Sequence, residues 1–297
     1  MSIASEPTII LSDLHLGHRA SQIRDPEEIA PILREAGAVV FNGDTVEMRT
    51  GVDRPVGRRM AAAIARLCHS IGCRATFING NHDPTISKID HLDLMNGRVL
   101  VTHGDILFLG VAPWSRQALA YRKIHLRALA HLGPDALVNL EKRLLATKRA
   151  SLRLQLLEQP VTGHAPAPNL LILLRQLWPP HRPFMILHAW MQTPTLAARL
   201  CELFRPNARY VLIGHTHYPG WWRRGQITVI NTGSYVLRFG ALAVILDGDS
   251  VEIRRIKRQK EGFVLGKRVA RFHETPDERL TVSRIAAEPD SPEARPE

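Results

Sequence analysis

The chain has 297 residues, 45% of them hydrophobic, which is enough for one large core or two small ones. Its formal net charge of +11 predicts anionic partners: phosphate-bearing substrates, nucleic acid or an acidic membrane surface. Its three cysteines are an odd number without metal-binding spacing, which argues against a disulfide scaffold and favours a reducing compartment.

The first hundred residues alternate between strand and helix patterns, with a hairpin pattern around Asn96-Gly97 at the end. The sequence "DPEE" is a typical helix start, and Gly72 is a typical helix stop. This alternation indicates an α/β layered fold. In chain order, the predicted elements are a strand at 8–12, a helix at 26–36, a strand ending at Asp44, a helix at 56–72 and a strand within 73–83.

Residues 113–205 differ from the rest, because Leu, Ala and Arg recur at helical spacing between prolines. They predict an insertion of three to five helices. Strand patterns return in "ARYVLIGHTH" and continue through "VEIRRIKR". Residues 273–297 combine an excess of acids with several prolines and predict a disordered tail, which leaves 1–272 as the folded domain.

Polar side chains of metal-ligand type follow five of the predicted strands. In open α/β sheets, ligands bind beyond the carboxyl ends of the strands. Asp, Asn and His without cysteine suit manganese, iron or zinc, and seven ligands are too many for one ion and suit two. The candidate metal ligands are Asp13, His15, Asp44, Asn81, His103, His215 and His217.

Five short motifs carry these ligands, and in their order they resemble the motifs of the calcineurin-like metallophosphoesterases. The motifs are "DLH" at 13–15, "GD" at 43–44, "GNHD" at 80–83, "HGD" at 103–105 and "GHTH" at 214–217. The resemblance spans about residues 8–246 outside the helical insertion. It implies an α/β fold in which helices flank a two-sheet β-sandwich, with a dinuclear metal centre at the strand ends.

The same resemblance implies a role for each ligand. Asp44 would bridge the two metals, of which manganese is favoured, with iron or zinc as alternatives. One metal would be held by Asp13, His15 and His217, and the other by Asn81, His215 and a histidine of the fourth motif.

Two histidines compete for the fourth motif. His103 follows a strand pattern and a predicted hairpin, whereas His188 lies in a helical segment 27 residues before His215. We favour His103, because a lone histidine in such a helical segment is more often a packed residue. His18 falls outside the ligand spacing and at best borders the substrate entrance.

His82 would not bind metal in this family but would lie beside the scissile phosphate. There it can protonate the leaving oxygen or stabilise charge on the phosphoryl oxygens, so we assign it as the catalytic residue. Asp83 either orients His82 or caps the following turn.

Together these features predict a dinuclear-metal hydrolase that cleaves a phosphoester or pyrophosphate bond. "GRVLVTHGD", a basic helical insertion and "GHTH" also resemble the UDP-2,3-diacylglucosamine pyrophosphatases, although their third motif typically has Arg where this chain has His82. A nucleotide-linked lipid is therefore one candidate substrate, with Arg116 and Arg122 contacting its phosphates or anionic lipid headgroups.

Two alternatives remain open. A nuclease or cyclic-nucleotide phosphodiesterase could use the same centre and bind nucleic acid through the basic surface. The aromatic content of 6% argues against it, because no stacking platform is evident. A catalytically inactive binding module is the remote alternative, since no ligand is missing.

We expect a cytoplasmic protein that can contact an anionic membrane peripherally, because no signal peptide or membrane-spanning run is visible. Residues 221–224 form either a rim of the site or a hairpin. A cluster of apolar residues in the insertion favours a core over a lipid-accepting cleft; its members are Leu170, Leu171, Leu173, Leu174, Leu177, Trp178, Phe184, Met185 and Trp190.

Overall fold

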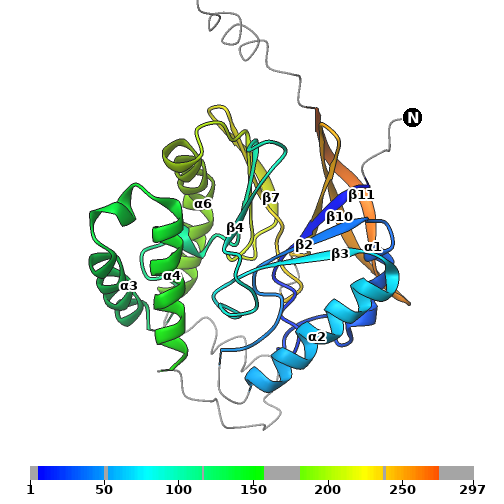
Figure 1. Cartoon of the computed structure of the whole chain (residues 1–297), viewed down its shortest axis with the longest axis horizontal. Coiled ribbons are helices and arrows are strands. Elements are labelled where there is room, and N and C mark those ends of the chain that lie inside the picture. Colours follow the sequence, from blue (N-terminus) through cyan, green and yellow to red (C-terminus); the bar gives the residue numbers. More distant parts are fainter. Residues whose placement is uncertain (1–5, 50–52, 116, 157–180, 237–238, 274–297) are drawn as a thin grey trace, which may run out of the picture.

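Two β-sheets pack face to face in the computed structural model, which describes residues 6–49, 53–115, 117–156, 181–236 and 239–273 (Figure 1). The first sheet contains, in spatial order, β11 (Gly262–His273), β10 (Ser250–Gln259), β9 (Leu242–Asp247), β1 (Thr8–Leu11), β2 (Ala38–Asn42) and β3 (Arg74–Ile78). The second contains β4 (His91–Leu94), β5 (Val99–Thr102), β6 (Tyr210–Ile213), β8 (Ile227–Asn231) and β7 (Gly220–Arg224). The predicted α/β fold with two sheets is confirmed.

Parallel pairing brings the carboxyl ends of the central strands together. Strands β1, β2 and β3 are parallel neighbours in the first sheet, and β5, β6 and β8 are parallel neighbours in the second. The predicted hairpin is formed by β4 and β5, and its turn residues Met95, Asn96 and Gly97 all have positive φ. Every predicted ligand-bearing loop therefore leaves the same edge of the sandwich.

Helices cover the outer faces of both sheets (Figure 1). α1 (Ala30–Leu33), preceded by the 3₁₀ turn η1 (Pro26–Ile29), and α2 (Asp53–Ile71) pack on the first sheet. The insertion contributes α3 (Ala118–Leu132), α4 (Leu140–Gln155) and α6 (Arg182–Phe204), and short 3₁₀ turns lie at Asp105–Leu107 and Pro134–Leu137. Among the described residues, no helix is both long and apolar enough to cross a bilayer.

The single helix predicted over 26–36 is wrong in its length. Asp25 caps the segment as expected, because its carboxylate accepts the Glu27 N–H at 2.9 Å. Pro31 then follows in the first turn of α1, and a proline has no N–H to continue a helix started before it. The segment therefore divides into one 3₁₀ turn and one α-helical turn.

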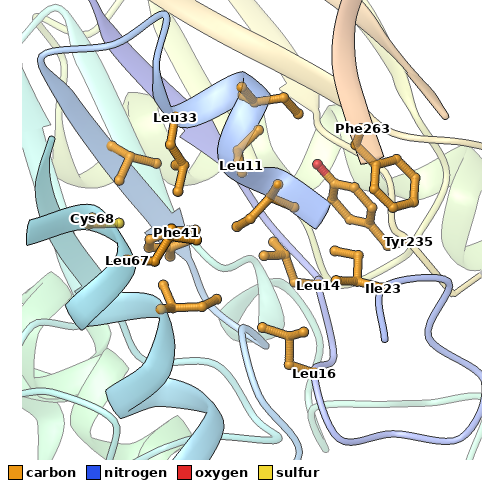
Figure 2. Packing of buried hydrophobic residues seen from close by; sticks show 14 of the residues in the cluster. Leu11, Leu14, Leu16, Ile23, Leu33, Phe41, Leu67, Cys68, Tyr235 and Phe263 are labelled. Carbon is orange, nitrogen blue, oxygen red and sulfur yellow. The ribbon is translucent and has the colours of Figure 1, made fainter. Parts of the chain in front are cut away.

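Successive side chains of the central strands point alternately into two cores, one between the sheet and its helices and one between the two sheets. On β1, Ile9 and Leu11 face the helices, where they pack with Phe41 and Leu67 (Figure 2), whereas Ile10 lies between the sheets. Burial on both faces explains why these strands are continuously apolar in sequence.

Strand β11 was not predicted. It pairs antiparallel with β10 in a long hairpin, and only part of its apolar residues, such as Phe263, reach the core. The basic segment 254–271 belongs to this hairpin, and its Lys257 and Lys267 side chains are exposed. The predicted tail at 273–297 lies outside the described residues except for His273, which ends β11.

Candidate metal centre

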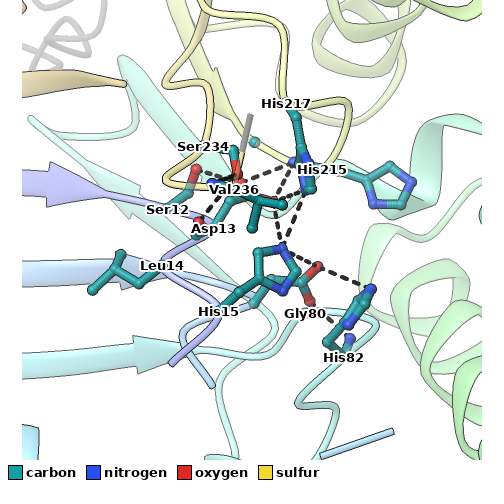
Figure 3. A network of polar contacts seen from close by, with 12 residues as sticks. Ser12, Asp13, Leu14, His15, Gly80, His82, His215, His217, Ser234 and Val236 are labelled. Atoms are coloured by element: carbon teal, nitrogen blue, oxygen red, sulfur yellow. Dashed lines mark hydrogen bonds and ion pairs between the residues drawn. The ribbon is translucent and has the colours of Figure 1, made fainter. Parts of the chain in front are cut away.

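The structure brings the predicted ligands together at the edge where the two sheets meet. Figure 3 shows Asp13 and His15 from the loop after β1 beside His215 and His217 from the loop after β6. The close approach of these loops requires glycine. A Cβ on Gly43, the residue before Asp44, would collide with the His103 ring, and the residue before His215 is also a glycine that has no room for a Cβ. Two of the motif glycines thus make room for ligand side chains.

Five ligand residues have left-handed backbone conformations, with φ between 49° and 65°: Asp13, His15, Asp44, His215 and His217. Such conformations are uncommon for residues other than glycine and cluster at functional sites. Backbone hydrogen bonds between neighbouring loops hold them, including one from His15 N–H to the Asp44 carbonyl at 2.9 Å. The ligands are therefore presented by tight turns and not by continued strands.

A first group of potential ligand atoms comes from Asp13, His15, Asp44 and His217, all within 4.8 Å of one another. Nε2 of His217 lies 3.1 Å from the Asp13 carboxylate and 3.2 Å from Nε2 of His15. Burial alone would raise the pKa of Asp13, but hydrogen bonds with His15 and His217 lower it well below its ordinary value. Two imidazole nitrogens converging on ionised carboxylates fit a divalent cation.

A second group comes from Asp44, His103 and His215. Nε2 of His103 lies 3.3 Å from the Asp44 carboxylate and 3.3 Å from Oδ1 of Asn81. Nδ1–H of His103 donates to the Asn42 carbonyl at 3.0 Å, which leaves Nε2 with its lone pair facing the group. Asn81 therefore lies beside the second group, close enough to be considered as a further ligand.

His215 is also fixed by a backbone carbonyl. Its Nε2–H donates to the carbonyl of Val111 at 2.8 Å, so Nδ1 is the nitrogen left to bind a metal. Val111 itself is buried with φ of 62°, an outlier for a β-branched residue. The Trp114 ring lies 5.2 Å from the imidazole and encloses it further.

Asp44 belongs to both groups. One of its carboxylate oxygens lies 3.3 Å from Nε2 of His103 and 3.7 Å from Nε2 of His15. The other oxygen accepts the backbone N–H of His82 at 2.8 Å. Burial would raise the pKa of Asp44, but His103 and His82 lower it well below its ordinary value. An ionised carboxylate between two groups of imidazoles fits the bridging position between two ions.

His82 lies beside this cluster, with Nε2 3.8 Å from the Asp44 carboxylate. Its Nδ1 lies 2.9 Å from a carboxylate oxygen of the buried Glu47. Burial would raise the pKa of Glu47, but the neighbouring His82 lowers it to about 2. His15, Glu47 and His82 form a third group of potential ligands. The geometry alone therefore allows His82 to act either as a metal ligand or as a proton donor.

The Asp83 carboxylate bonds to backbone N–H groups. It accepts the N–H groups of Asp44 at 3.0 Å, Thr45 at 2.7 Å and Gly80 at 2.9 Å. These donors belong to the Asp44 loop and to the residues before Asp83, and not to the turn that follows it, so the carboxylate joins two ligand-bearing loops instead of capping that turn. Glu47, three residues after Asp44, is the residue that contacts His82, and no local sequence pattern singles it out.

The remaining described candidates do not belong to the groups of ligand atoms. His188 is exposed on α6 and belongs to none of the groups found among the described residues. The His18 ring lies 6.1 Å from that of His15. Arg122 is exposed on α3, and no described contact brings its side chain to the centre, while Arg116 lies outside the described residues. Residues 221–224 form β7 in a hairpin with β8.

The helical insertion braces the loop that carries Asn81 and His82. The buried Gln155 at the end of α4 donates from its amide to the carbonyls of Asn81 at 3.2 Å and His82 at 3.4 Å. Lys148, also on α4, pairs at 3.2 Å with Asp90 farther along that loop. Neither contact has a local sequence pattern that predicts it.

Four aromatic residues gather next to His217, which we call the aromatic cluster: Trp190, Tyr218, Trp222 and Phe239. Trp190 stacks on Tyr218 with ring centroids 4.7 Å apart, and its indole N–H donates to the Thr216 carbonyl at 2.8 Å. Phe239 is 51% exposed. The sequence shows no such cluster, because its members are far apart along the chain and meet only in the folded structure.

Two packed sheets with parallel central strands, and with acids and histidines at their common edge, are the arrangement of a metallophosphoesterase fold. The family model described as calcineurin-like phosphoesterase matches residues 7–219, and the chain belongs to this family. A comparison with curated proteins found no match.

Several solved structures are similar to the chain at low identity. They include a Vps29 single mutant from Entamoeba histolytica (10% identity, TM-score 0.41, covering 91% of this chain and 99% of that one). A dimetal phosphatase from Danio rerio has 11% identity and a TM-score of 0.39, with 85% and 96% covered. The phosphoesterase Yfce from E. coli has 15% identity and a TM-score of 0.39, with 90% and 98% covered.

Proposed function

We propose that the protein is a hydrolase that uses two divalent metal ions to cleave a phosphoester or pyrophosphate bond. The observation that carries the proposal is the membership of Asp44 in two groups of ligand atoms, each confined within 4.8 Å. Two ions bound there would activate a water molecule and neutralise charge on the phosphoryl oxygens. Manganese is our first choice, with iron or zinc as alternatives, because the donors are oxygen and imidazole nitrogen.

His82 is the residue that we assign to proton transfer. Its side chain is 16% exposed, whereas Asp44 and His103 are almost completely buried, so His82 is the more accessible to a substrate. Glu47 accepts the Nδ1–H and thereby directs Nε2 toward the centre. A protonated Nε2 can donate to the leaving oxygen or to the phosphoryl oxygens.

The test is metal depletion and reconstitution of the full-length protein. We expect chelation to abolish hydrolysis of bis(p-nitrophenyl) phosphate and Mn²⁺ to restore it, with two ions bound per chain by elemental analysis. Hydrolysis that persists after complete removal of metal would disprove the two-metal mechanism. A protein that binds two ions but hydrolyses no phosphoester would instead be the inactive binding module.

For the substrate, we favour a nucleotide-linked lipid such as UDP-2,3-diacylglucosamine, with the protein at the cytoplasmic surface of an anionic membrane. The support is a row of exposed apolar side chains on α6: Phe184 at 73%, Leu187 at 52% and Met191 at 70% exposure. These residues recur at helical spacing, and an exposed apolar face suits acyl chains or a lipid surface. Of the cluster expected to form a core, Phe184 is exposed, which contradicts that expectation, and the members at 170–178 lie outside the described residues.

A nuclease or cyclic-nucleotide phosphodiesterase is the second candidate, and the aromatic cluster favours it. Tyr218 directly follows the ligand His217, and the basic side chains of Arg223 and Arg224 are exposed on β7 nearby. Aromatic rings with adjacent cations can stack nucleobases and hold phosphates.

Matched substrates separate the two candidates. A lipid pyrophosphatase should hydrolyse UDP-2,3-diacylglucosamine much faster than UDP-N-acetylglucosamine, and Met191→Ser should raise KM for the acylated substrate alone. A nuclease or cyclic-nucleotide phosphodiesterase should prefer single-stranded DNA or cyclic AMP, and Phe239→Ser should raise KM for these. Equal, slow hydrolysis of all four compounds would disprove both assignments.

A further inference from the structure

A pocket of about 590 Å³ lies next to the metal centre and is lined by three arginines, which we call the arginine pocket. Arg19 and Arg24 come from the loop after β1, and Arg258 comes from the end of β10, far away in sequence. All three side chains are exposed, so the pocket is open to solvent.

The charges of this pocket are poorly compensated. Arg258 pairs with Glu28 at 3.2 Å, but Arg19 and Arg24 form no ion pair within the described parts of the chain. Instead, Arg24 donates to the backbone carbonyl of Arg19 at 3.1 Å, which draws the two residues together. No carboxylate is among the lining residues. Three guanidinium groups around one opening create a positive potential that attracts an anion, and their planar forks match phosphate oxygens.

One wall of the pocket is bonded to the segment that carries the ligands Asp13 and His15. The hydroxyl of Ser21 donates at 2.7 Å to the carbonyl of Leu14, the residue between those two ligands. The N–H of Ala20 donates at 3.1 Å to His18, whose ring lies 6.1 Å from that of His15.

A second lining residue, Val236, is bonded to the same segment. The N–H of Val236, which lines the pocket, donates at 2.9 Å to the hydroxyl of Ser234. That hydroxyl donates at 3.3 Å to the carbonyl of Asp13, and Figure 3 shows both residues beside Asp13. The pocket is therefore held in a fixed position relative to the metal centre.

We propose that the arginine pocket binds a phosphate-type anion beside the metal centre. The identity of the anion rests on the proposed function: in a phosphoesterase, the anion is a second phosphate of the substrate, distinct from the phosphate that is cleaved. A free phosphate ion would use the same three arginines, and the experiment distinguishes these two sources.

The first arm measures binding without catalysis. Metal-free, full-length protein is titrated calorimetrically with inorganic phosphate, and Arg19→Gln/Arg24→Gln is compared with Arg59→Gln/Arg66→Gln, which removes the same charge from the exposed face of α2. We expect the first double variant to bind phosphate about tenfold more weakly and the second to bind like the wild type. Equal binding by all three proteins, or no binding by the wild type, would overturn the proposal.

The second arm identifies the source of the anion. With Mn²⁺ present, hydrolysis of thymidine 5′-(p-nitrophenyl phosphate) is compared with hydrolysis of the same ester carrying a 3′-phosphate. If the anion belongs to the substrate, Arg19→Gln/Arg24→Gln should raise KM for both esters to different extents. The fold-increase for the 3′-phosphorylated ester should be about ten times the fold-increase for the ester without that phosphate. Equal changes in KM, together with lost phosphate binding, would identify a free ion as the ligand. If the wild type hydrolyses neither these esters nor bis(p-nitrophenyl) phosphate, the proposed function fails, while the binding arm still decides about the pocket.

Discussion

The Glu47 carboxylate lies 2.9 Å from Nδ1 of His82, and this contact fixes the ring whose other nitrogen faces Asp44. Replacement by Gln keeps the shape but removes the charge that stabilises a protonated imidazole. We expect Glu47→Gln to lower kcat roughly 10- to 100-fold while two metals stay bound, as measured by steady-state kinetics and elemental analysis. Glu27→Gln on the exposed 3₁₀ turn is the matched control. Loss of metal in Glu47→Gln would show that Glu47 is itself a ligand.

Asp44 and His82 should respond differently to truncation. We expect Asp44→Ala to lose paired metal binding together with activity, because Asp44 belongs to both groups of ligand atoms. His82→Ala should retain both metals and lose roughly 10²- to 10⁴-fold in rate, the usual contribution of a general acid. Elemental analysis alongside kinetics checks both. Wild-type turnover in Asp44→Ala, or loss of metal in His82→Ala, would contradict the division between ligands and catalyst.

The two histidines that competed for the fourth motif provide a matched pair. His103 is buried against Asp44, whereas His188 is exposed on α6. We expect His103→Ala to bind one metal fewer per chain and His188→Ala to keep the wild-type content, measured after dialysis against Mn²⁺. The reverse result would return the fourth-motif role to His188.

The central strands and the clustering of the candidate ligands could be predicted because apolar runs and short polar motifs are local. The role of Glu47 could not be predicted, because a carboxylate three residues after Asp44 looks in sequence like any acidic residue in an exposed turn. Gln155 reaches Asn81 across 74 residues, a tertiary contact that helical periodicity does not encode. Strand β11 escaped prediction because its basic, exposed side obscures the alternation that its few core residues provide.

Gln155 tests whether the insertion supports the centre. Its amide donates to the carbonyls of Asn81 and His82, so Gln155→Ala should loosen the loop that carries both. We expect a roughly 10- to 100-fold weaker affinity for one of the two metals, with the other unchanged, in Mn²⁺ titrations. Gln155→Glu, which replaces the donor by an acceptor, should be at least as harmful, and Arg153→Ala on the exposed side of α4 serves as the control. An equal loss of both metals would point to general unfolding instead.

His125 links α3 to the loop before Val111 and should make folding stability depend on pH. Its Nδ1 accepts the Gly110 N–H at 3.2 Å, and burial, with the nearby Arg143 charge, lowers the pKa of His125 from 6.5 to about 4. Between these values the unfolded chain binds the proton more strongly, so this contribution is complete above pH 6.5 and is lost as the pH falls to 4.

The lost contribution is about 3 kcal/mol, from roughly 1.4 kcal/mol per unit of pKa. His125→Gln keeps an amide near Gly110 but does not titrate, so the difference in unfolding free energy between wild type and variant should shrink as the pH falls from 6.5 to 4. Urea denaturation at several pH values measures this difference. A constant difference across that range would show that His125 does not titrate with a lowered pKa, because other titrating groups affect both proteins equally.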